Sequence, residues 1–190
     1  MSTTNAPFGM RPSFHPSGLD RAQAFAGGIA SGYNTGILKG QPVAQNTSGN
    51  IIIATAGSAY LGAFAGCEWT DTDGRRRVSN QWTASTAYQT GSNITYYYSD
   101  VNIVYDIQAD GSLAQTSVGD QANFTNATAG STTTGLSAAT ISTTLAGTSA
   151  VGDMRIIGLT PSVDNAWGDA YTVVQVQVSR SQYVATINAV

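Results

Sequence analysis

Hydrophobic and polar residues alternate along several short stretches of the chain. At 174–178 three valines are separated by two glutamines, and at 94–98 and 103–107 isoleucine and tyrosine return at every second position. This period of two is typical of a β-strand with one buried face, because successive side chains point to opposite sides of a sheet. The isoleucine run at 51–53 predicts another strand, and the apolar run at 154–159 predicts a buried one.

Turn residues divide these stretches at short spacing. Asp73-Gly74, Asp110-Gly111 and Gly119-Asp120 are turn signals, and residues 165–168 form a fourth. No window of 12 residues shows a convincing 3.6-residue period, which an amphipathic helix would have. The pattern therefore predicts an all-β fold, a sandwich or a distorted β-barrel, with an extended N-terminal arm and long loops.

The predicted arm comprises residues 1–21. Prolines and glycines are so frequent there that we expect no helix and a broken β-ladder. Apolar side chains are interleaved with them, namely Phe8, Met10, Phe14 and Leu19. Two alternatives stay open: the arm lies along a partner surface that buries these side chains, or it packs on its own domain. Residues 22–190 are expected to form a single β-rich domain.

Residues 126–150 are of low complexity. They are almost entirely alanine, serine, threonine and glycine, and Leu136, Ile141 and Leu145 are the only large apolar residues among them. The segment is either a long loop laid over a neighbouring molecule or a set of threonine-rich strands of the domain itself. Composition does not choose between these two interpretations.

Low charge density indicates a component of an assembly. Only 10% of the residues are charged, against about 25% in a typical soluble domain, so long-range repulsion between copies is weak. The net charge is −3 and the pI is near 4.7, which leaves no basic field to attract nucleic acid. No apolar run approaches the roughly 18 residues of a membrane helix. Neither nucleic acid nor a membrane is an expected partner.

The first residues lack the basic segment and the apolar core of a signal peptide, and a single cysteine, Cys67, cannot form an internal disulfide. We therefore expect synthesis in the cytoplasm without secretion. Cys67 lies in the apolar stretch 61–69, where a buried, inert thiol is the usual case.

Catalysis by a Ser-His-Asp or Cys-His group would have to use His15, the only histidine. His15 lies in the arm and is followed directly by Pro16, which is a poor position for a general base and favours a contact role. Residues 71–74 resemble the start of a calcium loop, but Arg75 and Trp82 stand where oxygen ligands are required, so a polar hairpin turn is the better interpretation. We expect no enzyme activity, no metal, no cofactor and no small-molecule substrate.

Arg75, Arg76 and Arg77 form the only run of like charge. The ordinary interpretation is a solvated hairpin. The functional interpretation is ion pairing with an acidic partner surface, because guanidinium groups form bidentate pairs with carboxylates.

With these features the chain resembles the head-decoration, or cement, proteins of tailed bacteriophages. The likeness spans nearly the whole chain, and its best part is the opening. The segments that carry it are 5–12 (NAPFGMRP), 15–18 (HPSG), 29–33 (IASGY), 39–43 (KGQPV), 61–64 (LGAF), 69–71 (WTD), Trp82, 119–122 (GDQA), 154–159 (MRIIGL) and 164–170 (DNAWGDA).

The resemblance implies a β-rich structural protein of the virion, without an active site, made in the cytoplasm of the bacterial host. It would bind the major capsid protein on the outer capsid surface as a homo-oligomer, a trimer or dimer, and stabilise the head against the pressure of the packaged genome. Repeated contacts of an oligomer would make each weak contact effectively permanent. The expected contact residues are Pro7, Phe8, Arg11, Pro12, Phe14 and His15 of the arm, together with Arg75, Arg76 and Arg77.

Two other functions compete with this one. A phage tail or fibre component would bind carbohydrate through an aromatic face, although core packing is the commoner use of such residues in β proteins. A hydrolase would need His15 beside an ordered pocket. The aromatic face would consist of Trp69, Trp82, Tyr96, Tyr97, Tyr98 and Trp167.

Overall fold

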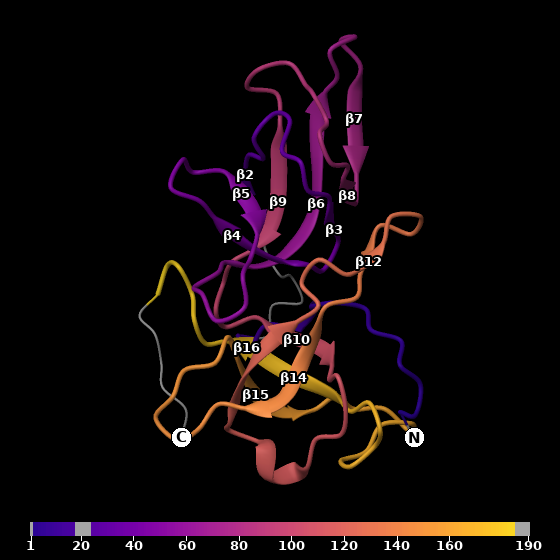
Figure 1. Ribbon diagram of the computed structural model, residues 1–190, viewed down its shortest axis with the longest axis vertical. Helices are drawn as coiled ribbons and strands as arrows, with labels where there is room; N and C mark the ends of the chain where they lie inside the picture. Colours follow the sequence, from indigo (N-terminus) through magenta and orange to yellow (C-terminus); the bar gives the residue numbers. More distant parts are fainter. Residues whose placement is uncertain (1, 18–23, 185–190) are drawn as a thin grey trace.

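The computed structural model describes residues 2–17 and 24–184. Strands make up 42% of the chain and helix 2%, which confirms the predicted all-β class. The strands form two open six-stranded antiparallel systems and two short strand pairs, and no closed barrel is present among the described residues. Figure 1 shows one system at each end of the molecule, so that the protein has an upper and a lower sheet. The single 3₁₀ turn in the described ranges is Gln115–Ser117.

The lower sheet contains the strand with the clearest alternation. Val174, Val176 and Val178 are buried, while the residues between them are partly exposed. The sheet joins the beginning of the chain to its second half, and its order is β1 (Arg11–Phe14), β10 (Val104–Gln108), β16 (Val173–Val178), β15 (Met154–Leu159), β11 (Gln121–Thr125) and β14 (Thr140–Leu145).

The upper sheet is built around the longest strand. β9 pairs with β6 along most of its length, with a register shift between Phe64 and Gly66. On the other edge of β6, its first part pairs with β4 and its last part with β7. The order is β2 (Ala24–Gly27), β9 (Ile94–Tyr98), β6 (Gly62–Thr70), β4 (Pro42–Gln45) and β5 (Ile51–Ile53), with β7 (Arg76–Ser79) beside β6; a short pair, β3 (Ile37–Leu38) and β8 (Gln81–Trp82), adjoins them.

Two hydrophobic clusters hold this arrangement. The larger lies between the sheets, where Tyr60, from the loop before β6, meets Phe124 of β11 edge to face with ring centroids 5.3 Å apart. The smaller belongs to the upper sheet and surrounds Trp82. Because aromatic rings contribute large buried areas, these contacts fix how the two sheets face each other.

β10 is buried on both faces, unlike the half-buried strand that its alternation predicts. Its polar residues Asp106 and Gln108 are covered by the N-terminal arm and satisfied by it: Arg11 pairs with Asp106, and the Gln108 side chain bonds the backbone of Thr4 and Ala6. Polar residues on a buried face are tolerated when their hydrogen bonds are complete.

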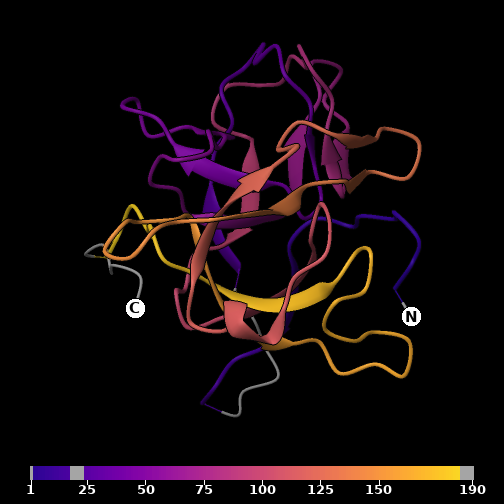
Figure 2. The same cartoon turned by 60° about the horizontal axis from the view of Figure 1, so that its bottom comes forward.

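The low-complexity segment at 126–150 contains both a projecting hairpin and a strand of the lower sheet. β12 (Gly130–Ser131) and β13 (Leu136–Ser137) form the hairpin, and β14 pairs with β11 through Phe124 and Ile141. Figure 2 shows the hairpin standing out from the body on the side where the N-terminal arm lies. Of the three large apolar residues of this segment, Leu136 therefore belongs to the hairpin, whereas Ile141 and Leu145 belong to β14.

Candidate partner-binding surface

The N-terminal arm runs over the outside of its own domain. The Ser2 backbone N–H donates to Asp169 Oδ2 over 2.8 Å, and the Met10 N–H donates to the carbonyl of Gly40 over 2.8 Å. Met10 is fully buried. Residues 2–17 of the predicted arm thus lie on the surface of their own domain, and residues 1 and 18–21, with Leu19, lie outside the described residues.

The expectation of a broken β-ladder is wrong for one part of the arm. Arg11–Phe14 forms β1, which pairs with β10 and shifts register between Pro12 and Phe14. The strand is at the edge of the sheet, where proline is tolerated because no further strand needs its missing N–H. The free side of β1 therefore remains on the surface.

Arg11 is held in place but stays accessible. Its Nη2 lies 3.2 Å from Asp106 Oδ2, and its guanidinium carbon lies 4.7 Å from the centre of the Phe8 ring. The Thr160 hydroxyl donates to the other oxygen of Asp106 over 2.9 Å. Since the Arg11 side chain is 61% exposed, further N–H donors of this guanidinium face solvent in a fixed orientation.

The other predicted contact residues of the arm differ in the exposed fraction of their side chains. Pro7, Phe8 and Pro12 are half-buried, whereas Phe14 is 43% exposed. A large apolar side chain exposed at the end of an edge strand is available for an intermolecular contact. The structure brings Phe8, Arg11 and Pro12 together, with Phe14 farther along the same strand.

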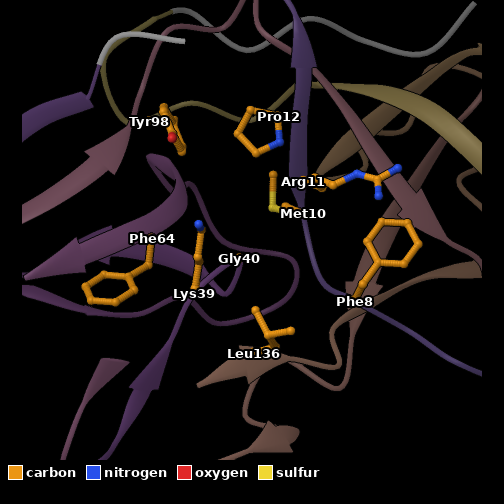
Figure 3. Close-up of a pocket in the computed structure, with 9 residues that line it drawn as sticks. All are labelled: Phe8, Met10, Arg11, Pro12, Lys39, Gly40, Phe64, Tyr98 and Leu136. Carbon is orange, nitrogen blue, oxygen red and sulfur yellow. The ribbon is translucent and has the colours of Figure 1, made fainter. Parts of the chain in front are cut away.

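A hollow of about 290 Å³ opens beside the arm, between the two sheets. In Figure 3 the Lys39 side chain extends between Phe64 and Met10 toward Tyr98, while the Arg11 guanidinium points away from the hollow, above Phe8. Leu136, on the projecting hairpin, is 46% exposed at its rim. The lining residues are Phe8, Met10, Arg11, Pro12, Lys39, Gly40, Phe64, Tyr98 and Leu136.

The hollow was not predicted from the sequence. Lys39 and Leu136 come from segments that lie far from the arm in sequence, so pattern analysis could not join them to it. Two signals pointed to Lys39: it is the only lysine of the chain, and it begins the segment 39–43, which shares in the resemblance to decoration proteins.

His15 follows β1 directly and lies between two polar partners. Its Nε2 is 3.2 Å from Asp100 Oδ2, and its Nδ1 is 2.6 Å from the Ser17 hydroxyl. The Asn102 backbone N–H above all, and also the His15 ring, lower the pKa of Asp100. Ser17 also donates its backbone N–H to the same ring nitrogen over 3.2 Å, so the serine contact belongs to a local turn in the exposed part of the arm.

The arginine run lies on the hairpin between β6 and β7, at the far end of the upper sheet (Figure 1). The turn has the predicted form, because the Gly74 N–H donates to the Asp71 carbonyl and Gly74 has a positive φ of 81°. Two of the three charges are already paired: Arg76 Nη2 lies 2.8 Å from Glu68 Oε1, and Arg77 Nε lies 3.1 Å from Asp71 Oδ2.

Arg75 has no ion pair within the described ranges, and its side chain is exposed. If the run contacts an acidic partner, we expect Arg75→Gln to weaken binding and to reduce its salt dependence more than Arg77→Gln does. An unpaired charge gives up no intramolecular partner when it binds. Pelleting of the protein with particles at several salt concentrations measures the difference. Equal effects of the two variants would contradict this assignment.

The only cysteine and the possible metal ligands were also located in the structure. Cys67 is buried, and desolvation raises the pKa of its thiol to about 12, as the predicted inert thiol requires. No group of three histidine, cysteine or acidic residues suited to a metal ion occurs among residues 2–17 and 24–184. The same residues contain no helix that is long and apolar enough to cross a membrane.

The aromatic residues of the competing carbohydrate-binding function are not gathered on one exposed face. Trp82 and Tyr97 are buried, and Trp82 meets Trp69 and Tyr88 edge to face at 5.5 and 5.9 Å. Trp167 packs against the other cluster, between the sheets. These aromatic rings contribute to the two cores.

Asp153 lies at the junction of the two sheets and was not singled out from the sequence. It is fully buried, and its carboxylate accepts the backbone N–H groups of Gly57 and Phe124 at 3.0–3.3 Å. Arg180 approaches it to 3.9 Å and also donates to the carbonyls of Gly57 and Val151. Burial raises the pKa of Asp153, against the opposing effects of these N–H groups and of Arg180.

Comparisons with protein-family models, with curated proteins and with solved structures gave no match to this chain.

Proposed function

We propose that the protein is a structural subunit of a tailed-phage virion that binds the outer capsid surface and stabilises the head. The observation that carries the proposal is the position of the arm. The segment that most resembles decoration proteins lies extended on the surface and presents Arg11 and Phe14 to solvent. An arm already held by its own domain pays little ordering entropy when it meets a partner.

Features of the whole chain agree with this function. The charged fraction of 10% suits close packing between copies and against a shell, because little charge must be desolvated in the contact. Exposed apolar side chains on separate projections, Val78 on β7 and Val163 between β15 and β16, offer further contact points. A homo-oligomer would present each of them several times, and several weak contacts then act together.

Deleting the arm is not a clean test of this function. The deletion would expose the core around Met10, remove Arg11 from Asp106 and leave Gln108 without the backbone groups of Thr4 and Ala6. A surface substitution avoids this difficulty. Electron microscopy of purified particles should show the chain on the outer shell, whereas its location in the tail would contradict the proposal.

We expect Phe14→Asp to reduce the occupancy of the protein on particles about tenfold, because a central apolar contact would be replaced by a hydrated charge. Val118→Asp is the matched control, since Val118 is 46% exposed and Phe14 is 43% exposed, and Val118 lies beside the 3₁₀ turn, outside the arm. Quantitative pelleting with depleted particles measures both variants. Equal occupancy for both would remove the arm from the contact surface.

A further inference from the structure

The hollow beside the arm combines an apolar floor with a cation. Tyr98 and Leu136 supply accessible apolar surface above the buried Met10 and Phe64, and the Lys39 side chain extends between Phe64 and Met10 toward Tyr98 (Figure 3). Within the described ranges the Lys39 amine has no hydrogen bond or ion pair. A volume of about 290 Å³ is at the lower limit of ligand pockets, and it suits one large side chain better than an extended cofactor.

The charge around the hollow differs from that of the whole chain. The net charge is −3 and lysines and arginines number only eight, yet Lys39 and Arg11 both border this hollow. Asp106 neutralises part of the Arg11 charge, whereas Lys39 is unpaired in the part of the chain that the structure describes. An occupant that carries a carboxylate next to an apolar group would therefore match both the floor and the cation.

A second hollow continues this surface along the arm. It has a volume of about 260 Å³, shares Phe8 and Arg11 with the first, and is bordered by Ser2, Thr3 and Thr4 and by the loop after β15. A larger share of its lining is polar than in the first hollow. Two adjoining hollows of different character suit an extended polypeptide, which can place an apolar side chain in one and polar groups in the other.

We propose that the hollow around Lys39 is the docking site for a segment of a partner polypeptide in which a large apolar side chain is adjacent to a carboxylate. This inference rests on the proposed function, in which the partner is the capsid protein. The apolar side chain packs against Tyr98 and Leu136, above the buried Met10, and the carboxylate pairs with Lys39. Arg11 holds the wall of the site through Asp106 and Phe8.

The chemistry of the site can be tested with the free protein and N-acetyl-leucine as the probe. With ¹³C-methyl-labelled methionine, the signal of Met10, which lines the hollow, should shift with a dissociation constant on the order of millimolar, while the signal of Met154, which does not line it, stays in place. N-acetyl-leucinamide, which lacks the carboxylate, should bind about fivefold more weakly or worse. An unmoved Met10 signal, or equal binding of the amide, overturns the inference.

Two variants separate the charge from the apolar contact. Lys39→Gln should lose the preference for the carboxylate over the amide, and Leu136→Ser should weaken both probes equally. Arg75→Gln, which removes an exposed cation elsewhere, should change neither. A loss of the preference in Arg75→Gln of the same size would show a non-specific charge effect and would overturn the assignment to Lys39.

Particles test whether the partner uses this site. Because Lys39 is the only lysine, acylation by an amine-reactive ester followed by mass spectrometry reports on it alone among side chains. We expect acylation of Lys39 to slow about fivefold or more in the particle-bound protein. If the protein binds particles while Lys39 reacts as fast as in solution, the inference fails and the proposed function stands. If the protein binds no particles, the proposed function fails, and the assignment of the capsid protein as the docking partner fails as well.

Discussion

Replacing Asp153 with alanine should lower the free energy of unfolding by about 3–5 kcal/mol, which is the largest effect that we expect from a single side chain outside the aromatic core. The substitution leaves the N–H groups of Gly57 and Phe124 without their acceptor, and it leaves the Arg180 guanidinium without its carboxylate. Because Gly57 lies in the loop between β5 and β6 of the upper sheet and Phe124 lies in β11 of the lower sheet, the loss weakens the junction between the sheets. Urea unfolding followed by tryptophan fluorescence measures the change.

Asp153→Asn should cost less than the alanine variant, since one amide oxygen remains as an acceptor. Asp73→Asn, in the exposed turn between β6 and β7, is the control and should stay within about 0.5 kcal/mol of the native protein. An alanine variant as stable as this control would show that the buried carboxylate does not hold the sheets together.

The contribution of Asp153 to folding stability also depends on pH. Burial raises the pKa of Asp153 above its ordinary value of 3.8, so the folded protein still holds the proton at a pH where the unfolded chain has lost it. Stability from this group is therefore highest below pH 3.8 and falls as pH rises through the raised pKa. Asparagine never ionises. We expect the stability difference between the native protein and Asp153→Asn to shrink as pH rises above about 4, and a difference that grows would contradict the raised pKa.

Replacing Gly9 with alanine should detach the arm and cost about 3 kcal/mol of folding stability. Gly9 has a φ of 75°, and an added Cβ would lie 2.6 Å from the Gly40 carbonyl oxygen and 2.7 Å from Ser137 Cβ. The left-handed conformation costs about 1–2 kcal/mol in a residue with a side chain, and the overlap adds about 1–3 kcal/mol. Since both neighbours belong to packed segments, the arm is the part that must move.

Hydrogen exchange should show this detachment directly, as faster exchange across residues 2–14, including the Met10 N–H that donates to Gly40. Gly91→Ala is the matched control: its φ is 77°, and no atom lies within 4 Å of the added Cβ. It should show the conformational cost alone, with normal exchange in the arm. If both variants lose the same stability and the arm stays protected, the close packing of Gly9 does not hold the arm.

Local patterns along the chain were sufficient to predict several of the strands, although others, such as β1, β4 and β11, were not predicted. The alternation at 174–178, the isoleucines at 51–53 and the apolar run at 154–159 correspond to β16, β5 and β15. The turn at 71–74 was also predictable, because aspartate and glycine adopt the unusual backbone angles that a tight turn requires. The burial of Cys67 followed from its apolar neighbours in the same way.

Tertiary structure decided everything that joins distant parts of the chain. β10 looked half-buried from its own sequence, and only the arm laid across it explains why Asp106 and Gln108 are covered. The place of Asp153 between two sheets, and the meeting of Lys39 with the arm and with Leu136, likewise involve partners that are far away in sequence. Periodicity reports which face of a segment is buried, but it carries no information about what buries it. The sequence by itself therefore determined an all-β, low-charge chain with an extended arm, and the packing of the arm onto its own sheets determined the surface that it offers to a partner.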